Sequence, residues 1–141
     1  MDGLPKAIRT IALLVVVTMG LLITACYGVI SQTGILEGNV TSGPIWPVEQ
    51  PGGNPPVPPE VFEARKILVY NKDRAELIET VDLRQIDQGQ VGYYSVQMKP
   101  GTYVVDINRV GMDSSSDVPK NVEIRPGETV EVNIDIDTGI R

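Results

Sequence analysis

Two kinds of hydrophobic pattern divide this chain. Residues 11–23 form an apolar run that contains no charged residue. From residue 34 onward, apolar and polar residues alternate in short segments, which is typical of β-strands with one face toward a core. The pattern therefore predicts an N-terminal hydrophobic segment, expected to form a signal helix, followed by an all-β region.

The alternating segments are separated by regular turn signals. We expect strands at residues 34–40, 66–70, 77–81, 93–98, 103–108, 122–124 and 130–136. Proline and glycine close two of them, at Pro100-Gly101 and at Pro126-Gly127, where they favour tight turns. About seven strands in roughly 100 residues favour an antiparallel seven-stranded Greek-key sandwich.

The same alternation predicts which side chains form the core. One helix-like run, residues 59–65, is expected to make about one turn. The expected inward positions are Val40, Ile67, Val69, Ile78, Val96, Val105, Ile107, Val122, Ile124, Val132 and Ile134.

A proline-rich insert interrupts the strand pattern at residues 41–60. It holds seven of the 11 prolines. Their fixed φ and missing N–H exclude a helix or a central strand. We expect an extended, polyproline-like connection with a hinge at Gly52-Gly53.

The N-terminus has the features of an export signal. Lys6 and Arg9 precede the apolar run, as in a secretory signal peptide. Ala25 and Cys26 follow the run, and this arrangement resembles the lipobox of bacterial lipoproteins. The resemblance implies cleavage between Ala25 and Cys26 and attachment of acyl chains, such as palmitate, at Cys26. A protein with two or three acyl chains stays at the membrane, whereas a protein with one chain is released from it.

Two other interpretations of the N-terminus stay open. The uncharged stretch from Thr10 to Ile30 has 21 residues, enough to cross a bilayer as an uncleaved signal anchor. The other open interpretation is ordinary secretion, with a cleaved signal peptide and no lipid. The preferred division is a lipoprotein-type signal peptide at 1–25, a tether at 26–33 and a β-domain at 34–141. We expect a lipid-anchored extracytoplasmic protein of the cell membrane or outer membrane.

One run of residues resembles the carboxypeptidase regulatory-like domains. Residues 92–103 place a glycine and two aromatic residues before Pro-Gly-x-Tyr, and Gly38-Asn39-Val40 is similar to that family's opening Gly-x-Val. The resemblance spans about residues 34–137 and implies a transthyretin-like sandwich. It also implies that Tyr103 packs and hydrogen-bonds across the Pro100-Gly101 turn. The insert at 41–60 departs from the family pattern.

Composition narrows the possible functions. The net charge is -6, and an acidic surface repels phosphate backbones, which disfavours nucleic-acid binding. The chain has no histidine, which excludes Ser-His-Asp and Cys-His catalysis. Cys26 is the only cysteine, which excludes an intramolecular disulfide and a CxxC metal site. We therefore expect neither an enzyme nor a bound cofactor.

Two sets of residues are candidates for binding. Trp46 and Phe62 are the only tryptophan and phenylalanine; an exposed Trp46 could dock a partner, or it could fold back over the edge of the sandwich. Asp135 and Asp137, with Asp106, could supply oxygen ligands to Ca²⁺ or form a solvated face.

The function predicted from these features is a non-enzymatic, membrane-anchored structural or binding module. Its expected partners are membrane lipid through Cys26 and an envelope protein or glycan. The alternative is an accessory domain that binds a small ligand or Ca²⁺ for a membrane-bound enzyme or transporter.

Overall fold

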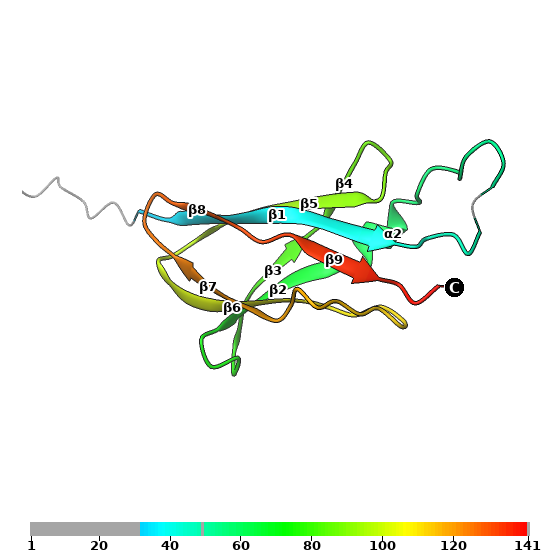
Figure 1. Cartoon of the computed structure of the whole chain (residues 1–141). Coiled ribbons are helices and arrows are strands. Elements are labelled where there is room, and N and C mark those ends of the chain that lie inside the picture. Colours follow the sequence, from blue (N-terminus) through cyan, green and yellow to red (C-terminus); the bar gives the residue numbers. More distant parts are fainter. Residues whose placement is uncertain (1–31, 49, 141) are drawn as a thin grey trace, which may run out of the picture. The chain divides into compact units, whose positions relative to one another are not determined.

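The structure is a computed structural model, and it describes residues 32–48 and 50–140. These residues form a β-sandwich of two sheets with one short helix (Figure 1). The predicted cleavage site at Ala25 and the predicted lipidation site at Cys26 lie outside the described residues. Among the described residues, no helix has the length and apolar character needed to cross a bilayer.

The first sheet, called sheet A, contains five strands. They are β1 (Gly34–Gly43), β4 (Arg84–Ile86), β5 (Val91–Met98), β8 (Thr129–Glu131) and β9 (Ile134–Asp137). β1 lies in the middle, with β5 antiparallel on one side and both β8 and β9 parallel on the other. β4 extends the sheet beyond β5.

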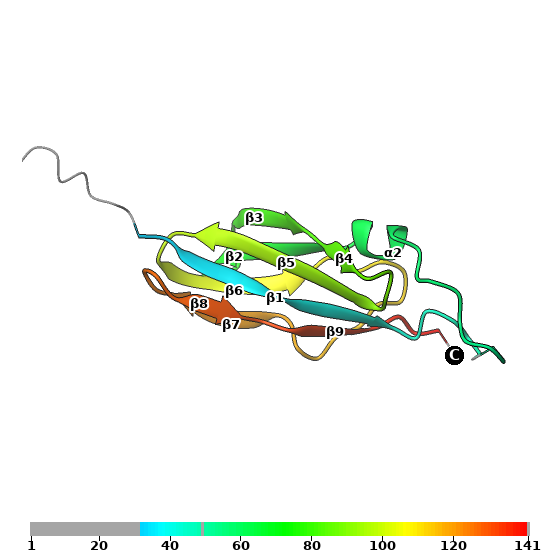
Figure 2. The ribbon, with the colours of Figure 1, turned by 90° about the horizontal axis from the view of Figure 1, so that it is seen from above.

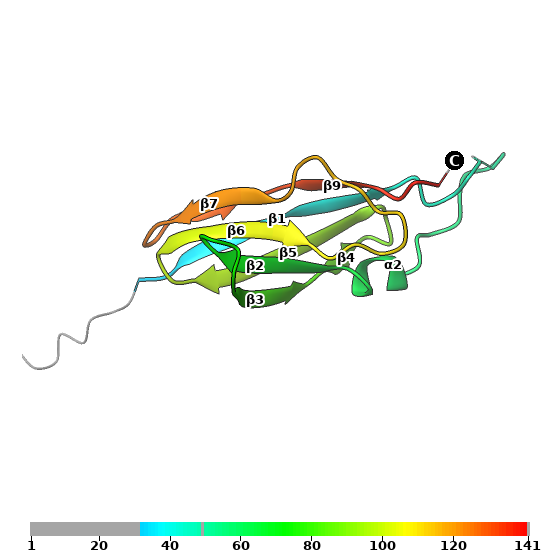
Figure 3. The same ribbon diagram turned by 90° about the horizontal axis from the view of Figure 1, so that it is seen from below.

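The second sheet, called sheet B, contains four antiparallel strands in the order β3-β2-β6-β7. They are β2 (Lys66–Asn71), β3 (Leu77–Asp82), β6 (Gly101–Ile107) and β7 (Lys120–Ile124). The helix α2 (Glu60–Glu63) precedes β2. Figures 2 and 3 show β3 beside β5 along one side of the sandwich, and β7 beside β8 and β9 along the other.

The core lies between the inner faces of the two sheets. Sheet A contributes Leu36, Val40, Tyr94, Ile134 and Ile136, and sheet B contributes Ile67, Val69, Val105, Val122 and Ile124. Burial of apolar surface at about 25 cal/mol per Å² is the main force that holds the layers together.

Most of the predicted inward positions are buried, and Ile78 is the exception. Its side chain is 44 % exposed. The pairing of β2 with β3 shifts register between Val69 and Tyr70, so that Tyr70 lies opposite Leu77. Ile78 is the residue left unpaired at this irregularity. Val81, three residues later, lies opposite the buried Ile67 and packs against the core, so alternation along β3 turns Ile78 to the outer face. Val96 is only partly buried.

The structure corrects the strand count and the strand directions. Nine strands are present in the described residues, because β4 was not predicted and the expected strand at 130–136 is interrupted at Val132 and Asn133. Sheet A is mixed rather than antiparallel, because the first and last segments of the domain lie side by side and run the same way. Side-chain alternation predicts a strand but carries no information on the direction of its neighbour.

The chain enters and leaves this domain at opposite ends. It enters through β1 at Gly34, next to the turn at Gly127, whose N–H donates to the Thr33 carbonyl over 3.1 Å. The parallel strands β1 and β9 both run toward the other end, where the described chain finishes (Figure 1). We call that other end the distal end; it comprises residues 44–48, 50–58, α2, 86–91, 108–119 and 138–140.

Candidate binding surface at the distal end

The proline-rich insert is attached to the domain at both of its ends. The Thr138 hydroxyl donates to the Pro44 carbonyl, and Ile45 packs against the core. At the other end Val57 is buried, and its N–H donates to the Gln88 carbonyl over 3.1 Å. Between these attachments, Val48 and residues 50–56 are exposed, and both Gly52 and Gly53 have a positive φ. The insert is therefore a surface loop with a turn at the predicted hinge.

Trp46 lies near the start of this loop and is partly buried. Its indole Nε1 is enclosed and has no hydrogen-bond partner among the described residues. The side chain therefore combines features of both predicted alternatives: it partly folds back on the domain and keeps some exposed surface.

Phe62 is a core residue, which corrects its prediction as a partner-binding side chain. It is fully buried on α2. Its ring lies against Gly92, where an added Cβ would come within 2.6 Å of the Phe62 Cδ1 atom. Because its surface is fully covered, Phe62 cannot contact a partner in the folded domain.

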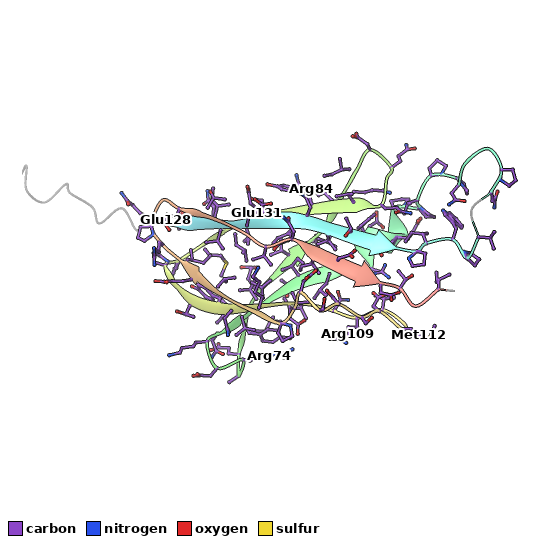
Figure 4. The ribbon with its side chains drawn as sticks, in the orientation of Figure 1. Arg74, Arg84, Arg109, Met112, Glu128 and Glu131 are labelled. Atoms are coloured by element: carbon purple, nitrogen blue, oxygen red, sulfur yellow. The ribbon has the colours of Figure 1, made fainter. Side chains whose placement is uncertain are left out.

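Exposed apolar side chains are concentrated at the distal end. Val48 is 72 % exposed, Ile86 40 %, Val110 36 % and Met112 74 %, while the other large exposed apolar residues described are Leu77 and Ile78 on β3. Figure 4 labels Met112 on the loop that follows β6. Met112 was not predicted from the sequence as a binding residue. The signal that could have identified it is a long apolar side chain within a loop of small and polar residues.

A buried ion pair fixes the loop that carries Val110 and Met112. The Arg65 guanidinium donates to both Asp113 carboxylate oxygens, over 2.7 and 2.8 Å. Asp113 also accepts the Val110 N–H over 3.2 Å, and Arg65 donates to the Val61 carbonyl. Both charged side chains are more than nine-tenths buried, so this pair holds the loop against the end of α2.

The three acidic residues considered for Ca²⁺ do not come together. Asp106 lies on sheet B, where it forms an ion pair with Arg74. Asp135 lies on sheet A, accepts the Thr41 hydroxyl over 2.6 Å and donates its N–H to Asp117 over 2.8 Å. The described part of the chain contains no cluster of three or more residues suited to a metal ion. Asp106 therefore does not join Asp135 and Asp137, and the Ca²⁺ alternative lacks its third carboxylate.

Two tyrosines of the run at residues 92–103 have structural roles. The Tyr103 hydroxyl donates to the Lys99 carbonyl over 2.9 Å, which confirms the predicted bond across the Pro100-Gly101 turn. The Tyr94 hydroxyl is buried and donates to the Val132 carbonyl over 2.7 Å. Burial raises the pKa of Tyr94, and the nearby carboxylate of Glu131 raises it further.

Every buried charge among the described residues is paired. Arg65 and Asp113 pair with each other, and Asp106 pairs with Arg74. General acid–base catalysis needs a positioned side chain that is free to exchange a proton with a substrate. The buried charges of the described domain instead hold its loops in place.

Comparisons with known proteins add a likeness of fold. No protein-family model matches this chain, and no curated protein is similar to it. Among solved structures, the minor pilin GBS52 of the Gram-positive pathogen Streptococcus agalactiae is similar, with a TM-score of 0.44 and 16 % identity. The match covers 77 % of this chain and 45 % of the pilin, so this chain matches less than half the length of that structure. The resemblances to lipoproteins and to carboxypeptidase regulatory-like domains, and the Greek-key and transthyretin-like assignments, stay predictions.

Proposed function

We propose that this chain is a membrane-anchored, extracytoplasmic β-sandwich that binds another envelope component with its distal end and catalyses no reaction. The observation that carries the proposal is the position of Val48, Ile86, Val110 and Met112 at the end opposite the chain entry. Exposed apolar side chains that gather in one region of a soluble domain mark interaction sites.

The anchor and the distal end fit one arrangement. Cys26 precedes β1 by a short tether, and β1 enters the domain at the end opposite the apolar loops. An anchor at Cys26 would therefore leave the distal end free to contact a protein or glycan of the envelope. The absence of histidine and the pairing of the buried charges support a binding role over catalysis.

The anchor is tested by substitution of Cys26. Lipidation predicts that Cys26→Ser prevents acylation and cleavage, so that the uncleaved precursor accumulates at a larger mass in membrane fractions. Intact-mass spectrometry of the wild-type protein would show the added acyl chains. A Cys26→Ser protein with the same mass shift, cleavage and membrane location as wild type would contradict the lipid anchor.

The binding role is tested at the distal end by in-membrane chemical crosslinking. We expect the double variant Val48→Ser, Met112→Ser to lose the crosslinked species formed by the wild type. Leu77→Ser is the matched control, because Leu77 is 48 % exposed but lies on β3, away from the distal loops. Equal crosslinking by the wild type and the double variant would exclude the distal loops as the contact.

A further inference from the structure

The β3–β4 segment changes sheets within one residue. β3 pairs with β2 as far as Asp82, and β4 begins at Arg84 against β5. Leu83 connects them and is buried. Because β4 is short, it pairs with β5 only at Val91–Tyr93. The rest of β5 has no strand on this side, so the edge of sheet A is open there.

The phase of the hydrogen-bond ladder shows which main-chain groups lie at this open edge. The Ser42 N–H donates to the Gln90 carbonyl over 3.1 Å, and β1 pairs with β5 without a register shift. Residues of an antiparallel strand alternate between its two neighbours. The main-chain groups of Tyr94 and Val96 therefore face β1, and those of Ser95 and Gln97 face the open edge.

The opposite wall of this opening is β3, and its edge is partly closed. The Thr80 N–H donates to no neighbouring strand and instead donates to the Glu79 carboxylate over 3.2 Å. No such side chain covers the N–H groups of Ser95 and Gln97 within the described residues. Unpaired groups on an edge strand are a template for pairing with another chain.

A groove follows the two edges. A hollow of about 310 Å³ lies between Val81 on β3 and Tyr94 and Val96 on β5. A second hollow of about 250 Å³ continues it past Met98 to Tyr103, and Glu79 borders both. Val81, Tyr94 and Val96 supply apolar lining, whereas Glu79, Thr80, Asp82 and Ser95 supply polar and charged lining. The β5 edge adds polar main-chain groups.

Basic residues flank the groove at its two ends. Arg84 lies at the end where β4 begins, and Lys99 lies at the end where β5 finishes. Neither forms an ion pair with another described residue. Figure 4 shows Arg84 at the β4–β5 edge, on the side away from Arg74. Asp82 lines the same end as Arg84, but its carboxylate pairs with Lys66, so Arg84 keeps its charge without a counter-charge there. The groove therefore has basic ends, and Glu79 borders its middle.

We infer that this groove binds an extended segment of a partner protein as an added strand on β5, with apolar residues at alternate positions and acidic residues at its ends. The open edge from Tyr94 to Met98 would take a segment of about 17 Å at about 3.4 Å per residue. The inference deepens the proposed binding function and names the chemistry of one partner.

A second copy of this chain fits the edge less well. If two copies paired through β5 in antiparallel fashion, Lys99 of one copy would approach Arg84 of the other. Like charges brought together across an interface oppose association. Charge complementarity therefore favours an acidic-ended segment of another protein.

The test uses the full chain in detergent and a synthetic peptide of alternating valine and threonine with a glutamate at each end. We expect fluorescence anisotropy to show binding, and the same peptide with lysine ends to bind about tenfold more weakly at low salt. Amide hydrogen exchange at Ser95 and Gln97 should slow at least about tenfold when peptide is bound. No binding, or unchanged exchange at these two amides with bound peptide, would overturn the inference.

Two variants separate strand addition from other binding. Ser95→Pro removes an N–H that faces the open edge and no hydrogen bond of the β1–β5 ladder, so it should weaken peptide binding at least about tenfold. Ser95→Ala keeps that N–H and should bind like the wild type. Equal binding by the proline and wild-type proteins would overturn the inference.

A charge-reversal variant covers the case in which Ser95→Pro fails to fold. Arg84→Glu combined with Lys99→Glu should prefer the lysine-ended peptide, and an unchanged preference would contradict the inference. If the protein formed a concentration-dependent dimer and Ser95→Pro abolished it, the occupant of the groove would be a second copy of this chain. That result would also overturn the inference. If the chain is acylated at Cys26 and yet binds neither peptide, only the groove inference is overturned. The lipid anchor of the proposed function is measured separately and would stand.

Discussion

The Tyr94 hydroxyl donates its hydrogen bond to the Val132 carbonyl at the point where the last strand of sheet A is interrupted. β8 finishes at Glu131 and β9 begins at Ile134. Without this bond the Val132 carbonyl would be buried and would lack a hydrogen-bond donor, and a buried polar group without a partner costs free energy. Tyr94 on β5 reaches across β1 at Gly38, the residue with no side chain to obstruct it.

Removal of this hydroxyl should destabilise the domain. Tyr94→Phe leaves the Val132 carbonyl without its donor, and we expect a loss of about 1–3 kcal/mol in the free energy of unfolding. Urea denaturation measures the change. Tyr103→Phe is the control, because the bond from Tyr103 to Lys99 is exposed and its loss should cost less. A larger loss in Tyr103→Phe than in Tyr94→Phe would contradict the assigned role.

The same hydroxyl predicts how stability depends on alkaline pH. Burial raises the pKa of Tyr94 above its ordinary value of 10.0. The neutral hydroxyl is therefore favoured by folding, and its contribution is fully present below pH 10 and is lost as the pH rises from 10 toward the folded-state pKa. Stability measured from about pH 8 to about pH 11 should fall more steeply for the wild type than for Tyr94→Phe. Parallel curves for the two proteins would be inconsistent with a buried, neutral Tyr94.

Gly38 should not tolerate a side chain. A Cβ at this position would lie 1.9 Å from the Val132 carbonyl oxygen, so β1 and the segment between β8 and β9 would have to separate. We expect Gly38→Ala to lower the free energy of unfolding by at least about 2 kcal/mol. Gly43→Ala on the same strand is the control, because the nearest atom to its Cβ would be 3.8 Å away. Thermal unfolding compares the two, and equal melting temperatures would contradict the close approach.

The Arg65–Asp113 pair should be sensitive to the loss of either charge. Asp113→Asn leaves the Arg65 guanidinium buried without a counter-charge, which we expect to cost about 3–5 kcal/mol. Chemical denaturation measures it. Glu123→Gln removes one partner of the exposed Glu123–Arg125 pair and should leave the unfolding midpoint unchanged within error. If Asp113→Asn were equally silent, the ion pair would not be what fixes the loop at residues 109–113.

The two aromatic residues singled out in the sequence should respond differently to truncation. Phe62→Ala empties a fully buried site against Gly92, and we expect it to cost about 3–5 kcal/mol. Trp46 is only partly buried, so Trp46→Ala should cost less. Denaturation of both variants under the same conditions checks the order, and a larger loss in Trp46→Ala would reverse the assignment of Phe62 as the core residue.

The sequence by itself predicted the β-sandwich and most of its core. A strand with one face in the core and one in solvent alternates apolar and polar residues, and this alternation can be read from the sequence. In the segment from Val130 to Ile136 the buried and exposed residues alternate as expected. The Pro100-Gly101 turn and the bond made by Tyr103 also followed from local chemistry. The proposed anchor at Cys26 depends on the sequence alone.

Only the tertiary structure decided which segments are neighbours. The parallel pairing of β1 with β8 and β9 joins residues about 94 positions apart. The register of β3 against β2, which turns Val81 rather than Ile78 toward the core, likewise depends on the strand opposite. Phe62 and Trp46 look alike in sequence, and packing alone separates the core residue from the surface one. The open edge of β5 has the same origin: alternation predicts that a strand exists, whereas the path of β3 into β4 through Leu83 determines where its neighbour stops.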